Sequence, residues 1–138
     1  MPLDLEEGAV LPGISRSITQ AKINRYAEAS GDFNPIHVDE EFARRTPLGG
    51  TVAHGMMVLA YASQVMEAAF GHDWLSTGRL DVRFRAPARP GDTISVSAKV
   101  TGIERGDGHS RVSCAVLCQN QQGDAVITGL AEVRLTDR

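Results

Sequence analysis

The second half of the chain alternates between hydrophobic and polar residues with a period of two, the pattern of strands that have one buried face. In the first such segment one face holds Leu80, Val82, Phe84 and Ala86, and the other holds Arg79, Asp81, Arg83 and Arg85. Similar rows follow over residues 94–100, 112–118 and 125–135, and the intervening turns cover 87–92, 106–108 and 122–124. Because these turns are short, we predict a four-stranded antiparallel meander. We also expect an early strand over residues 14–18.

The first half of the chain has helical periodicity instead. Thr19 is a suitable N-cap for a helix that runs to about Ser30, and Asp39 for a shorter one. A third helix, from about Gly55 to Phe70, is apolar almost all round, which is typical of a buried helix. Helices followed by an antiparallel sheet predict an α+β fold in which this third helix packs on the sheet.

Composition narrows the class of protein. The 138 residues suit one domain over 1–138, and the 42% hydrophobic and 22% charged content argues against disorder. A net charge of −3 gives no support for binding nucleic acid over a broad surface. The longest apolar run, 56–62, is too short to span a membrane, and no signal peptide opens the chain.

The two cysteines, Cys114 and Cys118, lie four residues apart on one face of a predicted strand. That separation is roughly 13 Å, too far for a disulfide. We therefore expect two free, buried thiols and a cytoplasmic protein.

The segment Ser30–His37 carries the first candidate chemistry. Asp32 and His37 lie in a loop stiffened by Pro35, and they can converge on one point if the loop folds back. At neutral pH such a pair offers a carboxylate and a mainly neutral imidazole, which together can bind a water and move its protons. The alternative is a turn in which Asp32 and Asn34 hydrogen-bond to nearby backbone while His37 lies on the surface.

The second candidate is Ala53–Met56, at the start of the apolar helix. The first N–H groups of a helix lack internal partners and favour negative charge, and Gly55 would let a substrate carbonyl come close. The alternative is a glycine that only permits close packing. Ser63 lies two turns further along nearly the same face. Its hydroxyl could reach the site or bond back to its own helix.

Other kinds of site fit less well. Asp32, His37, Asp39 and His54 could cluster around a metal, but their spacing matches no familiar ligand pattern. The chain has no Gly-x-Ser-x-Gly elbow of a serine hydrolase, and Gly49-Gly50 lacks the Lys of a phosphate-binding loop. Arg83 and Arg85 fit a solvated face, or a contact with the phosphates of a nucleotide carrier.

The stretch Tyr26-Ala-Glu-Ala-Ser-Gly-Asp32-Phe-Asn34-Pro35-Ile-His37, with Ala43 six positions on, resembles the signature of the MaoC-like, or hydratase 2, family. Residues 53–56, 82–84 and 89–92 resemble further family segments, so the resemblance covers most of the chain. Ala29 departs mildly, since a larger aliphatic residue or glycine is more usual there. The resemblance implies the hot-dog fold, a long helix wrapped by a curved antiparallel sheet, usually as a dimer.

The resemblance also implies the roles of individual residues. Asp32 and His37 match the catalytic pair that holds the water, and Gly55 matches the residue whose N–H binds the thioester carbonyl. Asn34 is expected to brace the loop, and Ser63 matches a serine that positions the pair. The implied reaction is (R)-specific hydration of trans-2-enoyl-CoA to (3R)-hydroxyacyl-CoA, with neither cofactor nor metal.

Three alternatives to this reaction remain at the level of sequence. A dehydratase of (3R)-hydroxyacyl groups on acyl carrier protein would use the same chemistry on another carrier, and arginines such as Arg83, Arg85 and Arg89 could bind that acidic carrier as well. A hot-dog thioesterase or a non-catalytic acyl-binding subunit would leave the Asp32–His37 loop unexplained.

Side chains such as Met56, Leu59 and Phe70 would shape the acyl tunnel. We expect a homodimer, because exposed strand edges need cover.

Overall fold

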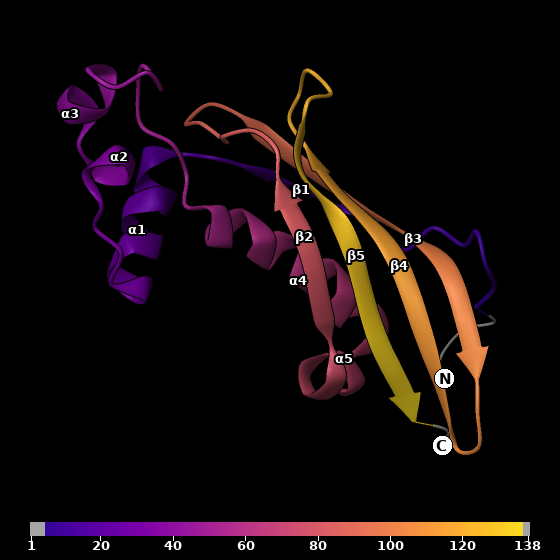
Figure 1. The fold of residues 1–138 in the computed structure, drawn as a ribbon. Coiled ribbons are helices and arrows are strands. Elements are labelled where there is room, and N and C mark those ends of the chain that lie inside the picture. The colour runs from indigo at the N-terminus through magenta and orange to yellow at the C-terminus, as the bar shows by residue number, and fades with distance from the viewer. Residues whose placement is uncertain (1–4, 137–138) are drawn as a thin grey trace.

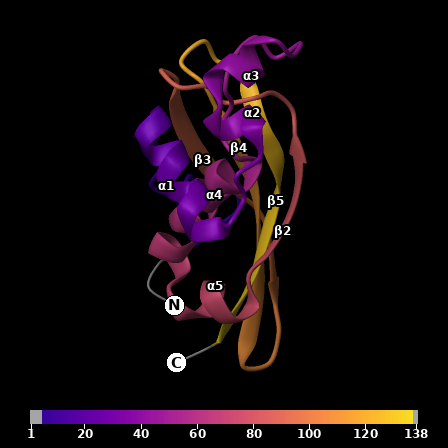
Figure 2. The same ribbon diagram turned by 90° about the vertical axis from the view of Figure 1, so that its left-hand side faces the viewer.

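The computed structural model describes residues 5–136, and in it one curved antiparallel sheet wraps a long helix (Figure 1). The helices lie on one side of the sheet, and three of them gather around the start of the long helix, in front of the sheet in Figure 2. The five strands are β1 (Ile14–Ser17), β2 (Arg79–Phe84), β3 (Thr93–Arg105), β4 (His109–Gln119) and β5 (Ala125–Thr136). The early strand and the α+β class predicted from the sequence are thus confirmed.

The predicted helices form at the predicted caps. The helices are α1 (Gln20–Ser30), α2 (Pro35–Val38), α3 (Glu40–Arg44), α4 (Gly55–Phe70) and α5 (His72–Thr77). The Thr19 side chain accepts a hydrogen bond from the Lys22 N–H and starts α1, which ends at Gly31 with φ 77°. Asp39 caps α3 in the same way, through the Phe42 N–H. In residues 5–136 no helix is long and apolar enough to cross a membrane.

Two short helices were not expected. The sequence predicted a loop where α2 forms, but Pro35 at its first position and the Asn34 cap suffice for one turn. Helix α5 follows Gly71, which separates it from α4, and buries Trp74 against the core. Both helices are only a turn or two long, below the length at which periodicity identifies a helix.

The predicted order of strands was wrong in one place. The sheet order is β1-β3-β4-β5-β2, so β2 pairs with β5 and not with β3. The segment 85–92 is a crossing and not a tight turn. At its start the Arg85 N–H donates to the Val126 carbonyl of β5 (2.8 Å). In its middle the Ala88 carbonyl accepts from the Ala53 N–H (2.7 Å), and at its end the segment bonds to Ile18. Eight residues reach roughly 26 Å, ample for the roughly 14 Å between β2 and β3.

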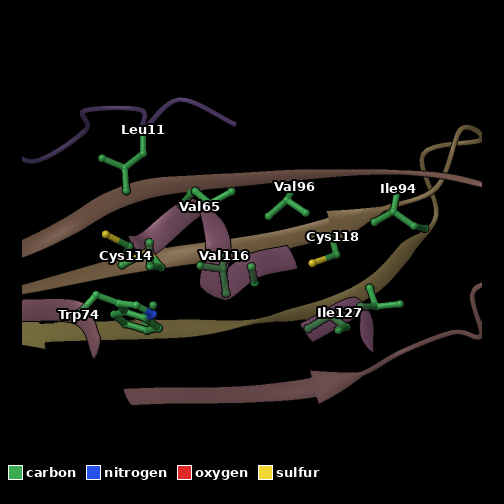
Figure 3. Close-up of a cluster of buried hydrophobic side chains, with 14 of the residues drawn as sticks. Leu11, Val65, Trp74, Ile94, Val96, Cys114, Val116, Cys118 and Ile127 are labelled. Carbon is green, nitrogen blue, oxygen red and sulfur yellow. The ribbon is translucent and has the colours of Figure 1, made fainter. Parts of the chain in front are cut away.

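The core lies between the sheet and one side of α4. Val65 of the helix faces residues of three strands, among them Val96, Cys114, Val116 and Ile127 (Figure 3). Cys114 and Cys118 are free and buried in the same row, as predicted, and burial raises the pKa of each thiol to about 11. The opposite side of α4 is not covered by the described chain, since Met56 is 59% exposed. The expectation of a helix buried all round therefore fails within this chain.

Candidate active site

The loop after α1 is built from side chains that bond to its own backbone. The Asn34 N–H donates to Asp32 Oδ1 (3.1 Å), and the Ile36 N–H donates to Asn34 Oδ1 (3.2 Å). The Asp32 N–H donates to Ser30 Oγ (3.2 Å). The local turn and the approach of Asp32 to His37, which the sequence analysis treated as alternatives, therefore occur together. Asn34 joins the loop to α2, and Asp32 keeps one carboxylate oxygen uncommitted.

His37 reaches this loop from the last turn of α2. Its Nδ1 lies 2.8 Å from the carbonyl oxygen of Val52, which can only accept, so the proton is on Nδ1. In the neutral ring Nε2 therefore carries a lone pair, and it lies 3.9 Å from Asp32 Oδ2. The His37 side chain is 11% exposed and the Asp32 side chain 53% exposed. The gap is too long for a direct hydrogen bond, but a water bonded to both atoms can lie beside it.

The position of His37 depends on a network that the sequence did not reveal. Gln20 Nε2 donates to the His37 carbonyl (2.8 Å), and the Thr51 hydroxyl donates to Gln20 Oε1 (2.7 Å). The Val52 N–H donates to the Ile36 carbonyl (3.0 Å). Helix α2 is therefore tied both to α1 and to the segment that leads into α4.

His54 was considered from the sequence only as a possible metal ligand, and the structure brings it into contact with both Asp32 and His37. Its Nε2 lies 2.9 Å from the carbonyl oxygen of Asp32, and its ring stacks on that of His37 with centroids 3.9 Å apart and planes at 25°. Tyr26 lies on the ring of His54 at 4.8 Å. The sequence grouped His54 with Asp32, His37 and Asp39 as possible metal ligands but gave no signal for its hydrogen bond to the Asp32 carbonyl or for its stacking on His37.

Gly55 begins α4, and its N–H has no recorded acceptor in residues 5–136. Beside it lies a cavity of about 370 Å³ lined by Val58 of α4, Phe84 of β2, and the crossing residues Arg85 to Ala88. A Cβ on Gly55 would lie 2.8 Å from Phe84 Cε1, so a larger residue here would displace that ring. Gly55 thus lines a cavity together with Val52, whose carbonyl accepts from His37, whereas Asp32 and His37 are not among the described residues that line it.

Of the remaining predicted site residues, Arg85 lines the cavity, and Ser63, Arg83 and Met56 do not. Ser63 Oγ accepts a hydrogen bond from Trp74 Nε1 (2.9 Å), and among the described residues it has no hydrogen bond with Asp32 or His37. Arg85 lines the cavity and donates from Nε to Thr128 Oγ1 (3.0 Å). Arg83 is exposed and lies 3.9 Å from Asp81, and neither it nor Met56 is among the described residues that line the cavity.

Asp32, His37 and His54 offer donor atoms within 4.8 Å of one another, the separation at which a metal ion can be considered. The carbonyls of Val52 and Asp32 engage His37 Nδ1 and His54 Nε2, so the lone pairs are on His37 Nε2 and His54 Nδ1. The two rings are stacked, and lone pairs in the planes of stacked rings do not converge on one tetrahedral centre. The Asp32 carboxylate and the His37 lone pair can instead bind a water and move its protons.

Comparisons with known proteins define the family and the fold. The MaoC like domain matches residues 6–121. The (R)-specific enoyl-CoA hydratase of Rhodospirillum rubrum is 31% identical over 98% of this chain and 91% of its own. The 3-hydroxybutyryl-CoA dehydratase of Methylorubrum extorquens is 33% identical over 80% and 70%. The unliganded R-hydratase of Pseudomonas aeruginosa superposes with a TM-score of 0.83 at 28% identity, over 98% of this chain and 84% of that one.

These findings define the class of protein: a hydro-lyase with the hot-dog fold. The chain belongs to the MaoC-like, hydratase 2 family. The resemblance seen in the sequence is thereby confirmed.

Proposed function

We propose that the protein adds water reversibly to trans-2-enoyl-CoA and gives (3R)-hydroxyacyl-CoA. The observation that carries this proposal is the 3.9 Å gap between His37 Nε2 and Asp32 Oδ2, with Nδ1 held by Val52, next to the free N–H of Gly55. The gap suits a water, and the N–H suits the oxygen of a thioester. The relatives named hydratase and dehydratase support the substrate and the configuration of the product.

In the forward direction, the water oxygen forms its bond to C3 as the double-bond electrons move towards the thioester oxygen. The Gly55 N–H stabilises the negative charge that develops there. The Asp32–His37 pair takes one proton from the water and supplies one proton to C2, so the pair ends in its starting protonation state. Because the two groups are coupled, each transfer belongs to the pair and not to one residue.

We assign supporting roles to two further residues. Asn34 holds the loop through Asp32 Oδ1 and the Ile36 N–H, so it fixes the carboxylate. Arg85 lines the cavity beside Gly55 and has a charge suited to the phosphates of coenzyme A. The exposed position of Arg83 and its contact with Asp81 give it no comparable support.

The test is an assay of the purified protein with a short trans-2-enoyl-CoA and no added metal. We expect the absorbance of the conjugated enoyl thioester to fall and chiral analysis to give the (3R) product. The same acyl group on acyl carrier protein, run in parallel, separates the two carriers. Faster turnover on the carrier protein would assign the chain to the alternative, the dehydratase of fatty acid synthesis. A (3S) product, or no hydration of either thioester, would contradict the proposal.

We also propose a homodimer in the cytoplasm. Within the described chain β2 is an edge strand, and Phe84, 55% exposed, lies on it. Such an edge beside the uncovered side of α4 suits closed two-fold pairing. The free cysteines support a reducing compartment. Sedimentation is expected to give twice the mass of the 14.8 kDa chain, and a monomer at micromolar concentration would contradict this assembly.

A further inference from the structure

The imidazole of His54 makes two contacts with the catalytic pair from outside the reacting gap. Its Nε2 bonds to the main-chain carbonyl of Asp32 (2.9 Å), and its ring lies on that of His37 (3.9 Å between centroids). The residue is 3% exposed. One side chain therefore contacts both members of the pair, although it lies 22 residues beyond Asp32 and 17 beyond His37.

The hydrogen bonds define which nitrogen of His54 carries the proton. The Asp32 carbonyl can only accept, so the proton is on Nε2. Nδ1 is then an acceptor, and it is buried without a hydrogen-bond partner among the described residues. Leaving a buried acceptor unpaired destabilises the folded state. A phenylalanine would lack this unpaired acceptor but also the N–H that bonds to Asp32, so the histidine is explained by that bond and not by ring packing alone.

We propose that His54 is a positioning residue of the hydratase site: it holds Asp32 by its N–H and orients His37 by its ring. The proposal rests on the function proposed above. The N–H fixes the main chain at Asp32 and thereby the direction of its carboxylate. The stacked ring limits rotation of the His37 imidazole, so that Nε2 stays directed at Oδ2. Tyr26 contacts the His54 ring at a tilt, with centroids 4.8 Å apart and planes at 55°.

Two substitutions separate the two contacts. His54→Phe keeps a flat ring and removes the donor, whereas His54→Gln keeps an N–H donor and removes the ring. We expect each to lower kcat on the order of 10- to 100-fold, because small misplacements of reacting groups have effects of this size. KM should stay within about twofold, since His54 is not placed to touch the acyl carrier. His72→Phe and His72→Gln, at an exposed histidine that starts α5, are matched controls expected to turn over like the wild type.

Amide hydrogen exchange tests the positioning of Asp32 without an assay of activity. The Asn34 amide donates to Asp32 Oδ1, so its exchange reports how firmly that carboxylate is held. By NMR we expect it to be about threefold faster or more in His54→Phe, and close to the wild-type rate in His54→Gln. Amides of β4 serve as the internal reference and should not change in either variant.

The outcomes are distinguishable. If the wild type hydrates no enoyl thioester, the proposed function fails and the exchange data alone decide the positioning role. If both variants fold, retain wild-type kcat and leave Asn34 exchange unchanged, the positioning role is overturned. If activity falls only in proportion to the folded fraction, measured by thermal unfolding, His54 is a packing residue and the positioning role is also overturned.

Discussion

At the scale of single residues, main-chain carbonyls decide what the two histidines of the site can do. The Val52 carbonyl places the proton of His37 on Nδ1, and the Asp32 carbonyl places that of His54 on Nε2. His37 thus presents a lone pair to the side where Asp32 lies. The spacing of Asp32 and His37 predicted their approach from the sequence. It could not predict the tautomers, because the partners of both rings come from distant segments.

Gly55 provides a prediction at the same scale. Gly55→Ala is expected to lower kcat/KM about tenfold or more, because its methyl group would lie 2.8 Å from Phe84 Cε1 and crowd the approach to the free N–H. The fold should persist, since Phe84 is 55% exposed and its ring can move outwards. Steady-state kinetics and thermal unfolding check both statements.

The double variant Gly55→Ala/Phe84→Leu is the control for Gly55→Ala. Leucine removes the ring that the methyl group meets. If crowding by Phe84 alone caused the loss, the double variant should regain kcat/KM. If the methyl group itself obstructs the thioester, kcat/KM of the double variant should stay low. Wild-type kcat/KM in Gly55→Ala would contradict the role given to this N–H.

At the scale of elements, local signals predicted the helix ends well and the sheet order less well. The caps Thr19 and Asp39 act within three residues of themselves, so sequence suffices to find them. The pairing of β2 with β5 depends on where the segment 85–92 crosses, and its contacts to Ala53 and Ile18 are long-range. Alternation of residues identifies a strand and its faces but not its neighbour.

The β2–β5 pairing predicts a strong effect at Gly129. Its backbone passes so close to β2 that a Cβ would collide with Asp81 O and lie 2.7 Å from Val82 Cα. Gly129→Ala should therefore lower the free energy of unfolding by about 2 kcal/mol, measured by denaturant titration. Gly102→Ala in β3 is the matched control, since a Cβ there meets nothing within 4 Å. Equal stability of the two variants would contradict the β2–β5 register.

The buried row of β4 predicts a pH dependence. Below the ordinary thiol pKa of 9.0, Cys114 and Cys118 are protonated in both the folded and the unfolded protein. Between 9.0 and about 11 only the unfolded chain ionises, so the free energy of unfolding should fall as the pH rises through this window. Iodoacetamide at pH 8 should leave both thiols unmodified until denaturant is added, and rapid labelling of the native protein would contradict their burial.

At the scale of the whole molecule, the apolar character of α4 exceeds what one chain buries. The sheet covers Val58, Ala62 and Val65, whereas Met56 and Ala60 remain exposed. The sequence therefore predicted more burial than one chain provides, and the proposed second copy would supply the remainder. The extent of a single domain over residues 1–138 stays a prediction.

The central claim is that Asp32 and His37 together hold and activate the water. The most direct measurement is kcat of Asp32→Asn for hydration of a short trans-2-enoyl-CoA. Asparagine keeps an oxygen for the Asn34 N–H, so the loop and its fold should remain, while the ionised group is lost. The account predicts a fall in kcat on the order of 100- to 10,000-fold with the thermal midpoint unchanged. A folded Asp32→Asn protein that hydrates the substrate within about threefold of the wild-type rate would contradict it.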